Sequence, residues 1–157
     1  MHSRIFQISS NPIAKEDYIR ESDFFDHWFT TERADYVNED TDRDSDIDWL
    51  KSATSGLEFG VDEGGEYFVL KNKSEFFEKT YTRFTETIDE LTSLSMQDFS
   101  TTKIDHLMWE LKNAWNNEYG FYVAYESTWD IDTLYAYMRY CNEGDKFYIG
   151  ATIDYHS

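Results

Sequence analysis

The residues whose types and spacing could do chemistry are first of all the acidic side chains between positions 35 and 48. Carboxylates stand at every second position from 40 to 48, with two more just before them, and only Arg43 opposes them. The set is Asp35, Glu39, Asp40, Asp42, Asp44, Asp46 and Asp48. The segment has almost no apolar content, so we predict an exposed loop whose negative charge is offered to a partner.

The alternating acids also raise the possibility of a calcium loop of the EF-hand type. Such a loop needs oxygen ligands at positions 1, 3 and 5, glycine at position 6 and glutamate at position 12. Counting from Asp40, position 6 is Ser45 and position 12 is Lys51. A start two residues later gives Ile47 and Ala53. The pattern therefore does not predict an EF-hand, and we assign no metal site.

His106 and Glu110 lie four residues apart on a predicted helix and can share one face of it. A metal needs at least a third protein ligand in such a site, and neither His2, His27 nor His156 supplies one from the sequence. We interpret the pair as a surface contact.

The sequence contains no motif that is typical of covalent catalysis. There is no nucleophile elbow, no phosphate-binding glycine loop and no zinc-protease motif. Cys141 is the only cysteine and lies on the apolar face of a predicted helix, where a buried and unreactive thiol is expected. The sequence indicates no cofactor and gives no positive evidence for an enzyme.

Aromatic residues crowd the last third of the chain. Tyr and Trp dominate binding energy at protein interfaces, and here they alternate with charged residues. We predict that part of this set contacts a partner, namely Tyr122, Tyr125, Trp129, Tyr137 and Tyr140.

Charge limits the class of partner. The chain has 157 residues and a net charge of −18, and acids exceed bases in each third of the sequence. Nucleic-acid binding depends largely on Lys and Arg that neutralise phosphates, so direct binding to DNA, RNA or anionic lipid is not expected. A basic protein is the expected partner.

The elements that must position these residues follow from the hydrophobic pattern. Strands are predicted at 4–9, 57–61, 66–71, 121–127 and 146–155, and glycines 64 and 65 supply a hairpin turn between the second and third. In the last strand, Phe147, Ile149, Ala151, Ile153 and Tyr155 are predicted to face one side.

Two long amphipathic helices are predicted on either side of the short segment 95–100. Apolar residues recur every three or four positions from Phe77 to Leu91 and again from Ile104 to Trp115. A third helix is predicted at 130–144, and Ser45 with Asp48 predicts a capping box for a short helix at 46–54 that buries Trp49.

This order predicts a single α+β domain over residues 1–157. We expect a mostly antiparallel sheet of about five strands, with the long helical hairpin and the third helix packed on one face. The chain has neither a signal-peptide pattern nor a long apolar run, so a cytoplasmic protein is expected.

The functional hypothesis is an acidic protein-binding module that captures a basic partner. Inhibitors of the immunity type and proteins that mimic DNA share this composition, although no motif supports the comparison. The alternative is a small enzyme or ligand-binding domain with a carboxylate-lined pocket. A concave pocket with converging carboxylates would favour the alternative.

Overall fold

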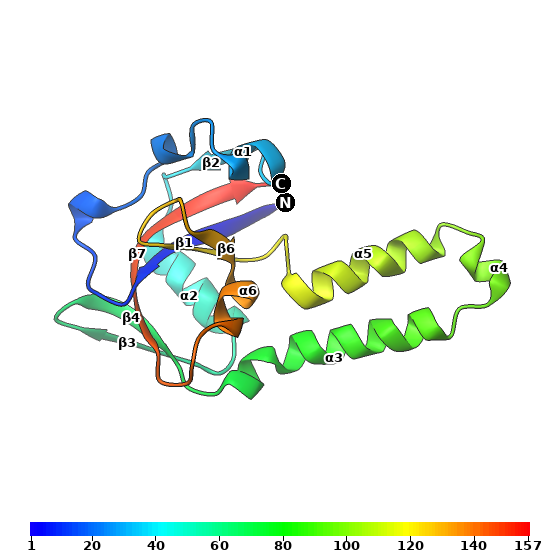
Figure 1. Cartoon of the computed structure of the whole chain (residues 1–157). Coiled ribbons are helices and arrows are strands. Elements are labelled where there is room, and N and C mark those ends of the chain that lie inside the picture. Colours follow the sequence, from blue (N-terminus) through cyan, green and yellow to red (C-terminus); the bar gives the residue numbers. More distant parts are fainter.

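The central strand β1 (His2–Ser9) organises the sheet, because both of its neighbours come from the far end of the chain. It pairs antiparallel with β7 (Lys146–His156) and parallel with β5 (Tyr122–Tyr125). The computed structural model describes all residues, 1–157, and shows an α+β fold around this strand (Figure 1).

Four more strands complete a mixed sheet of seven. The edge hairpin consists of β3 (Leu57–Asp62) and β4 (Gly65–Leu70), and β6 (Ile131–Thr133) forms the opposite edge. The order is β3-β4-β7-β1-β5-β6, and β2 (Tyr36–Asn38) pairs with the last residues of β7 beyond the reach of β4.

The prediction of a mostly antiparallel sheet of about five strands therefore gives too few strands and misses the parallel pair of β1 and β5, which makes the sheet mixed. All five predicted strands are present, but β2 and β6 add two strands of three residues each. The predicted helix at 130–144 is reduced to α6 (Leu134–Arg139), because β6 takes its first residues. Strands this short are not long enough to show an alternating pattern.

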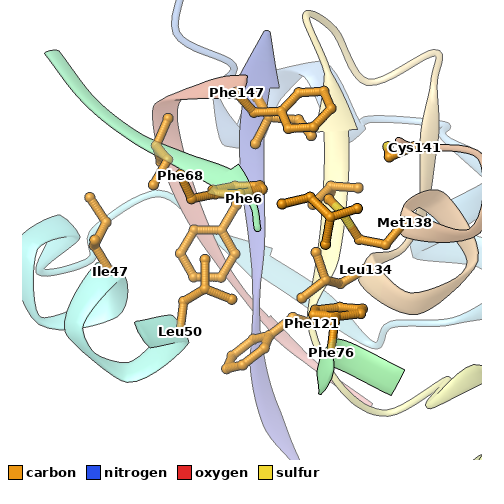
Figure 2. Close-up of a cluster of buried hydrophobic side chains, with 14 residues drawn as sticks. Phe6, Ile47, Leu50, Phe68, Phe76, Phe121, Leu134, Met138, Cys141 and Phe147 are labelled. Atoms are coloured by element: carbon orange, nitrogen blue, oxygen red, sulfur yellow. The ribbon is translucent and has the colours of Figure 1, made fainter. Parts of the chain in front are cut away.

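Apolar clusters lie on both faces of the sheet. One cluster contains Phe6, Ile8 and Phe68 and is covered by α2 (Arg43–Ala53) and α6 (Figure 2). The other contains Ile5 and Ile153. It is covered by the N-terminal segment, which holds the 3-10 turns η1 (Lys15–Asp17) and η2 (Glu21–Phe24) and the helix α1 (Trp28–Glu32).

The long helices form an arm that points away from the sheet (Figure 1). The arm comprises α3 (Lys73–Thr92), α4 (Met96–Phe99) at its tip and α5 (Lys103–Asn116). With 20 residues, α3 is about 30 Å long. None of the helices combines the length and apolar character that a bilayer span requires.

The prediction that this hairpin packs on one face of the sheet is therefore also wrong. The helices α3 and α5 pack on each other, and Thr87 and Leu107 are buried on the inner faces of the arm. At its base, Phe76 belongs to the sheet cluster. Two helices that each carry an apolar stripe can cover one another, so neither requires the sheet.

The prediction that alternate residues of the last strand all face one side is wrong, because β7 contains a β-bulge. Phe6 pairs with Thr152 but Ile8 pairs with Ile149, so two residues of β7 oppose the single residue Gln7. The extra residue inverts the side-chain alternation. Phe147 and Ile149 consequently face one cluster, whereas Ala151, Ile153 and Tyr155 belong to the other.

Candidate functional site

The seven acidic residues predicted as one loop lie on either side of β2 and at the start of α2. Asp35 lies just before β2, with its carboxylate 3.2 Å from Nδ1 of His156. Glu39 follows the strand and accepts a hydrogen bond from the backbone N–H of Glu21 at 2.9 Å. Asp40 is exposed. The segment is therefore not a plain solvated loop.

Helix α2 starts three residues earlier than the capping box predicts. Asp42 is its N-cap, because its carboxylate accepts hydrogen bonds from the backbone N–H and the hydroxyl of Ser45. These bonds lower the pKa of Asp42 below its ordinary value of 3.8. Asp44, Asp48 and Trp49 are exposed on the helix, so the predicted burial of this tryptophan is wrong.

Asp46 has a structural role. Its side chain is only 5% exposed, and it lies 2.6 Å from Nε of Arg4. Its second oxygen accepts a hydrogen bond from the Thr152 hydroxyl at 2.8 Å. A carboxylate in this position fixes α2 to the sheet and is not free to contact a partner.

Tyr122 is also interior. Its ring lies 4.9 Å from that of Phe29 and 5.5 Å from that of Tyr155, and its hydroxyl donates to the carbonyl of Glu118. Burial raises the pKa of Tyr122 to about 12. The ring stabilises the fold and does not reach the surface.

The other four predicted aromatic residues gather at one edge of the sheet. Because β1 and β5 are parallel, their carboxyl ends meet at this edge. The loop 126–130 connects β5 to β6 here, and neighbouring residues of this loop line two adjacent hollows. We name these hollows the tyrosine pocket and the aromatic groove.

The tyrosine pocket has a volume of about 560 Å³. The rings of Tyr125 and Tyr137 are nearly parallel in its wall, 6.1 Å apart and inclined by 20°. The Tyr125 hydroxyl lies 3.1 Å from that of Ser10 at the end of β1. The pocket is lined by Ser10, Tyr125, Asp130, Asp132, Tyr137, Tyr140, Cys141, Asp145, Lys146 and Phe147.

The aromatic groove is larger, about 910 Å³, and lies between the N-terminal segment and the same loop. Three exposed rings border it, those of Phe25, Trp28 and Trp129. Carboxylates outnumber cationic side chains around it by five to one: Glu16, Asp17, Asp23, Asp26 and Glu126 against Arg20.

Two residues of the groove have left-handed backbone, Asp26 with φ of 56° and Glu126 with φ of 62°. Such conformations cost free energy in residues other than glycine and persist where surrounding contacts hold them. The backbone N–H of Glu126 donates to Ile8, and its side chain accepts from the Ser9 hydroxyl. The end of β1 therefore holds the loop in this strained form.

His27 links the two walls of the groove. Its Nδ1 accepts a hydrogen bond from the backbone N–H of Phe29, and its Nε2 lies 2.9 Å from the carbonyl of Thr128. These contacts correspond to a neutral ring that donates from Nε2. With both nitrogens engaged in hydrogen bonds, His27 holds the two walls of the groove together.

The remaining candidates do not form a site for chemistry. Nowhere do three His, Cys, Asp or Glu side chains converge in a way that could hold a metal ion. His106 and Glu110 are 3.6 Å apart on the surface of the arm. Cys141 is buried, as predicted, and burial raises the pKa of its thiol to about 11.

Phe25, Trp28, Asp23 and Asp26 were not predicted as functional residues. From the sequence, this region is either helical, with a loosely fitting stripe of Ile19, Phe24 or Phe25, Trp28 and Phe29, or irregular, and the chain forms short 3-10 turns and one helix of five residues. A usable signal was present in the aromatic pairs 24–25 and 28–29. In the first pair Phe24 is buried and Phe25 is exposed. In the second pair Phe29 is buried and Trp28 is exposed.

Comparisons of the chain with family models, with characterised proteins and with solved structures find no match.

Proposed function

We propose that this chain is a cytoplasmic, acidic protein-binding module that captures a basic protein through the aromatic groove and the adjoining rim of the tyrosine pocket. One observation carries the proposal. The three most exposed aromatic side chains of the whole chain are Trp129 at 89%, Tyr140 at 88% and Phe25 at 74%. All three line these two hollows, among carboxylates.

This combination fits the side chains of lysine and arginine. A carboxylate accepts charge-assisted hydrogen bonds from an ammonium or guanidinium group, and an aromatic face attracts the same cation. The groove offers both within one concave surface. An anionic partner would be repelled by the five carboxylates that surround it.

The net charge of −18 supports the same partner at longer range. A strongly negative surface accelerates the approach of a cationic protein and has less effect on the final affinity, which depends on buried contacts. Six of the seven predicted acidic residues contribute to this field, since only Asp46 is buried. An inhibitor that covers the nucleic-acid-binding surface of a basic enzyme is the form of this function that we favour.

Site-specific crosslinking tests the proposal. A photoreactive phenylalanine derivative replaces Trp129 in one variant and Tyr81, an exposed aromatic residue of the arm, in the control. We expect position 129 to capture basic proteins from a native lysate at low salt, with a yield that falls as ionic strength rises. Capture of the same proteins from both positions, or capture that does not depend on salt, would contradict the proposal.

A matched pair of charge variants gives an independent test with the captured protein. Asp23→Asn, Asp26→Asn and Glu126→Gln together remove three negative charges from the groove. Asp44→Asn, Asp48→Asn and Asp105→Asn remove three from other exposed positions. We expect the first set to weaken binding at least about tenfold, which corresponds to one lost charged contact, and the second to change only its salt dependence. Equal weakening of binding by the two sets would contradict the proposal that the groove binds the partner.

A further inference from the structure

The chain already holds one of its own cations between two tyrosines and a carboxylate. The ammonium group of Lys146 lies 3.9 Å from the ring centroid of Tyr67 and 4.7 Å from that of Tyr148. It is 2.6 Å from the carboxylate of Asp62. The two rings are 6.0 Å apart. In this arrangement two tyrosine rings and one carboxylate together bind an ammonium group.

The tyrosine pocket repeats these components around a hollow. Its ring pair, Tyr125 and Tyr137, is 6.1 Å apart, and Asp130, Asp132 and Asp145 supply carboxylates. A third ring, Tyr140, stands almost fully exposed at its rim.

No cationic side chain of the protein forms a salt bridge with the carboxylates of this pocket. None of its three carboxylates takes part in a salt bridge. Lys146 lines the wall, but its ammonium group is held by Asp62, Tyr67 and Tyr148, none of which lines the pocket. Asp132 and Asp145 accept backbone hydrogen bonds from Thr133 and Asn142. The pocket therefore presents aromatic faces and negative charge that no salt bridge compensates.

This composition excludes other ligand classes. Anions would meet three carboxylates. A metal ion would need ligands that converge on one point, and the carboxylates do not do so. A neutral apolar molecule would gain from the rings but would leave the carboxylates without a partner.

We propose that the tyrosine pocket binds an organic cation, either an alkylated ammonium or a guanidinium group, against the faces of Tyr125 and Tyr137. The carboxylates of Asp130, Asp132 and Asp145 supply the opposite charge. A volume of about 560 Å³ lies within the range of small-molecule sites, so the pocket admits the charged group together with part of the chain that carries it. The inference shares the rim residue Tyr140 with the proposed function, but the ring pair and the three carboxylates inside the pocket carry it, and its test requires no partner protein.

A titration with a charged ligand and its uncharged isostere tests this directly. Choline and 3,3-dimethylbutan-1-ol have nearly the same shape, and only choline is charged. We follow the amide and tyrosine ring signals of the full chain by NMR. Choline is expected to shift the signals of Tyr125 and Tyr137 and to bind severalfold more tightly than the alcohol, because only the charged ligand is attracted by the aromatic faces and the carboxylates. Equal affinities, or shifts confined to other residues, would overturn the proposal.

Variants separate the site from the general negative charge. Asp130 is exposed, so Asp130→Asn leaves the fold intact, and Asp44→Asn is the control with the same change of charge elsewhere. Tyr140→Leu removes a ring at the rim without disturbing the core. We expect Asp130→Asn and Tyr140→Leu to weaken choline binding severalfold and Asp44→Asn to leave it nearly unchanged. Equal weakening by the two aspartate variants would reduce the effect to net charge and overturn the site.

A second probe distinguishes a cation carried by a partner protein from a free small molecule. A capped tripeptide with a central trimethyllysine carries the same headgroup as choline on a polypeptide. Tighter binding of the peptide assigns the pocket to a side chain of a partner protein, and tighter binding of choline assigns it to a free small molecule. If both probes bind while crosslinking from Trp129 fails, the pocket stands and the proposed protein capture does not.

Discussion

The side-chain oxygen of Gln7 accepts a hydrogen bond from the backbone N–H of Ala151 at 3.1 Å, inside the β-bulge of the last strand. The same oxygen accepts from Ile19, and the side-chain nitrogen donates to the carbonyls of Asp17 and Glu126. One buried amide thus satisfies four backbone groups. It joins the bulge, the N-terminal segment and the loop that lines the candidate site.

Gln7→Leu tests this role, because leucine has a similar size and no polar atoms. We expect a loss of about 2–4 kcal/mol in the free energy of unfolding, since buried backbone groups lose their partners. Urea unfolding followed by circular dichroism measures it. Gln97→Leu, at the exposed tip of the arm, is the matched control and is expected to cost less than about 0.5 kcal/mol. Similar losses in the two variants would contradict the role of Gln7.

Asp46→Ala is expected to be far more harmful than any other single substitution among the predicted acidic residues. It leaves Arg4, which is itself largely buried, without one of its two carboxylates and leaves the Thr152 hydroxyl without its acceptor. The expected loss is about 3 kcal/mol in the free energy of unfolding. Thermal or urea unfolding of this variant beside Asp44→Ala, which changes an exposed residue, gives the comparison. A loss below that of the control would show that the ion pair contributes nothing.

The contact between Asp62 and Lys146 predicts a defined dependence of stability on pH. The hydrogen bond from Lys146 lowers the pKa of Asp62 below its ordinary value of 3.8 and, reciprocally, raises that of Lys146 above 10.5. The contribution of Asp62 is therefore complete above pH 3.8 and is lost as pH falls through the lowered folded value. That of Lys146 is complete below pH 10.5 and is lost as pH rises through the raised folded value.

Asp62→Asn should consequently lower the melting temperature between these limits and have no effect in strong acid. Melting temperatures of the wild type and the variant, measured by circular dichroism across the acid range, should converge below pH 3.8. Asp44→Asn, whose carboxylate is 89% exposed, should show no such convergence because it starts with almost no difference. A constant gap between Asp62→Asn and wild type down to strong acid would refute the linkage.

Leu107→Ala tests whether the arm is stabilised by its own packing. Leu107 is buried within the arm, whereas Leu134 lies in the sheet cluster. Either substitution is expected to cost about 2–5 kcal/mol where its surroundings are folded. Hydrogen exchange should accelerate mainly in α3 and α5 for Leu107→Ala, and across the sheet for Leu134→Ala. Uniform acceleration in both variants would show that arm and sheet unfold together.

Much of the fold is predictable from local patterns in the chain. The glycine turn, the five longer strands and both arm helices follow from alternation or helical spacing. The placement of the arm does not, because a stripe such as that from Ile104 to Trp115 shows that a face is apolar and not what covers it. The bulge has one sequence signal, Gly150, since glycine inside a strand pattern often marks such a site.

The candidate site is predictable only in part. Tyr125 and Tyr122 were predicted together, but three positions apart on a strand they face opposite sides, so one lines the pocket and the other is in the core. Asp46 could not be distinguished from its neighbours, because its partners Arg4 and Thr152 are remote in the sequence. Contacts between distant segments decide which of several similar residues is exposed.

The position of β1 has a consequence for how the chain folds as it is synthesised. Its register joins Ile5 to Tyr122 on one side and to Ile153 on the other, so the first strand has no partner until β5 is synthesised and lacks its second partner until β7 has left the ribosome. Such distant pairings slow folding, because a long loop must close before the contacts form. The arm needs only neighbouring residues and can form much earlier. During translation, therefore, a finished helical hairpin should precede the sheet, with the apolar residues of β1 left for chaperones to shield.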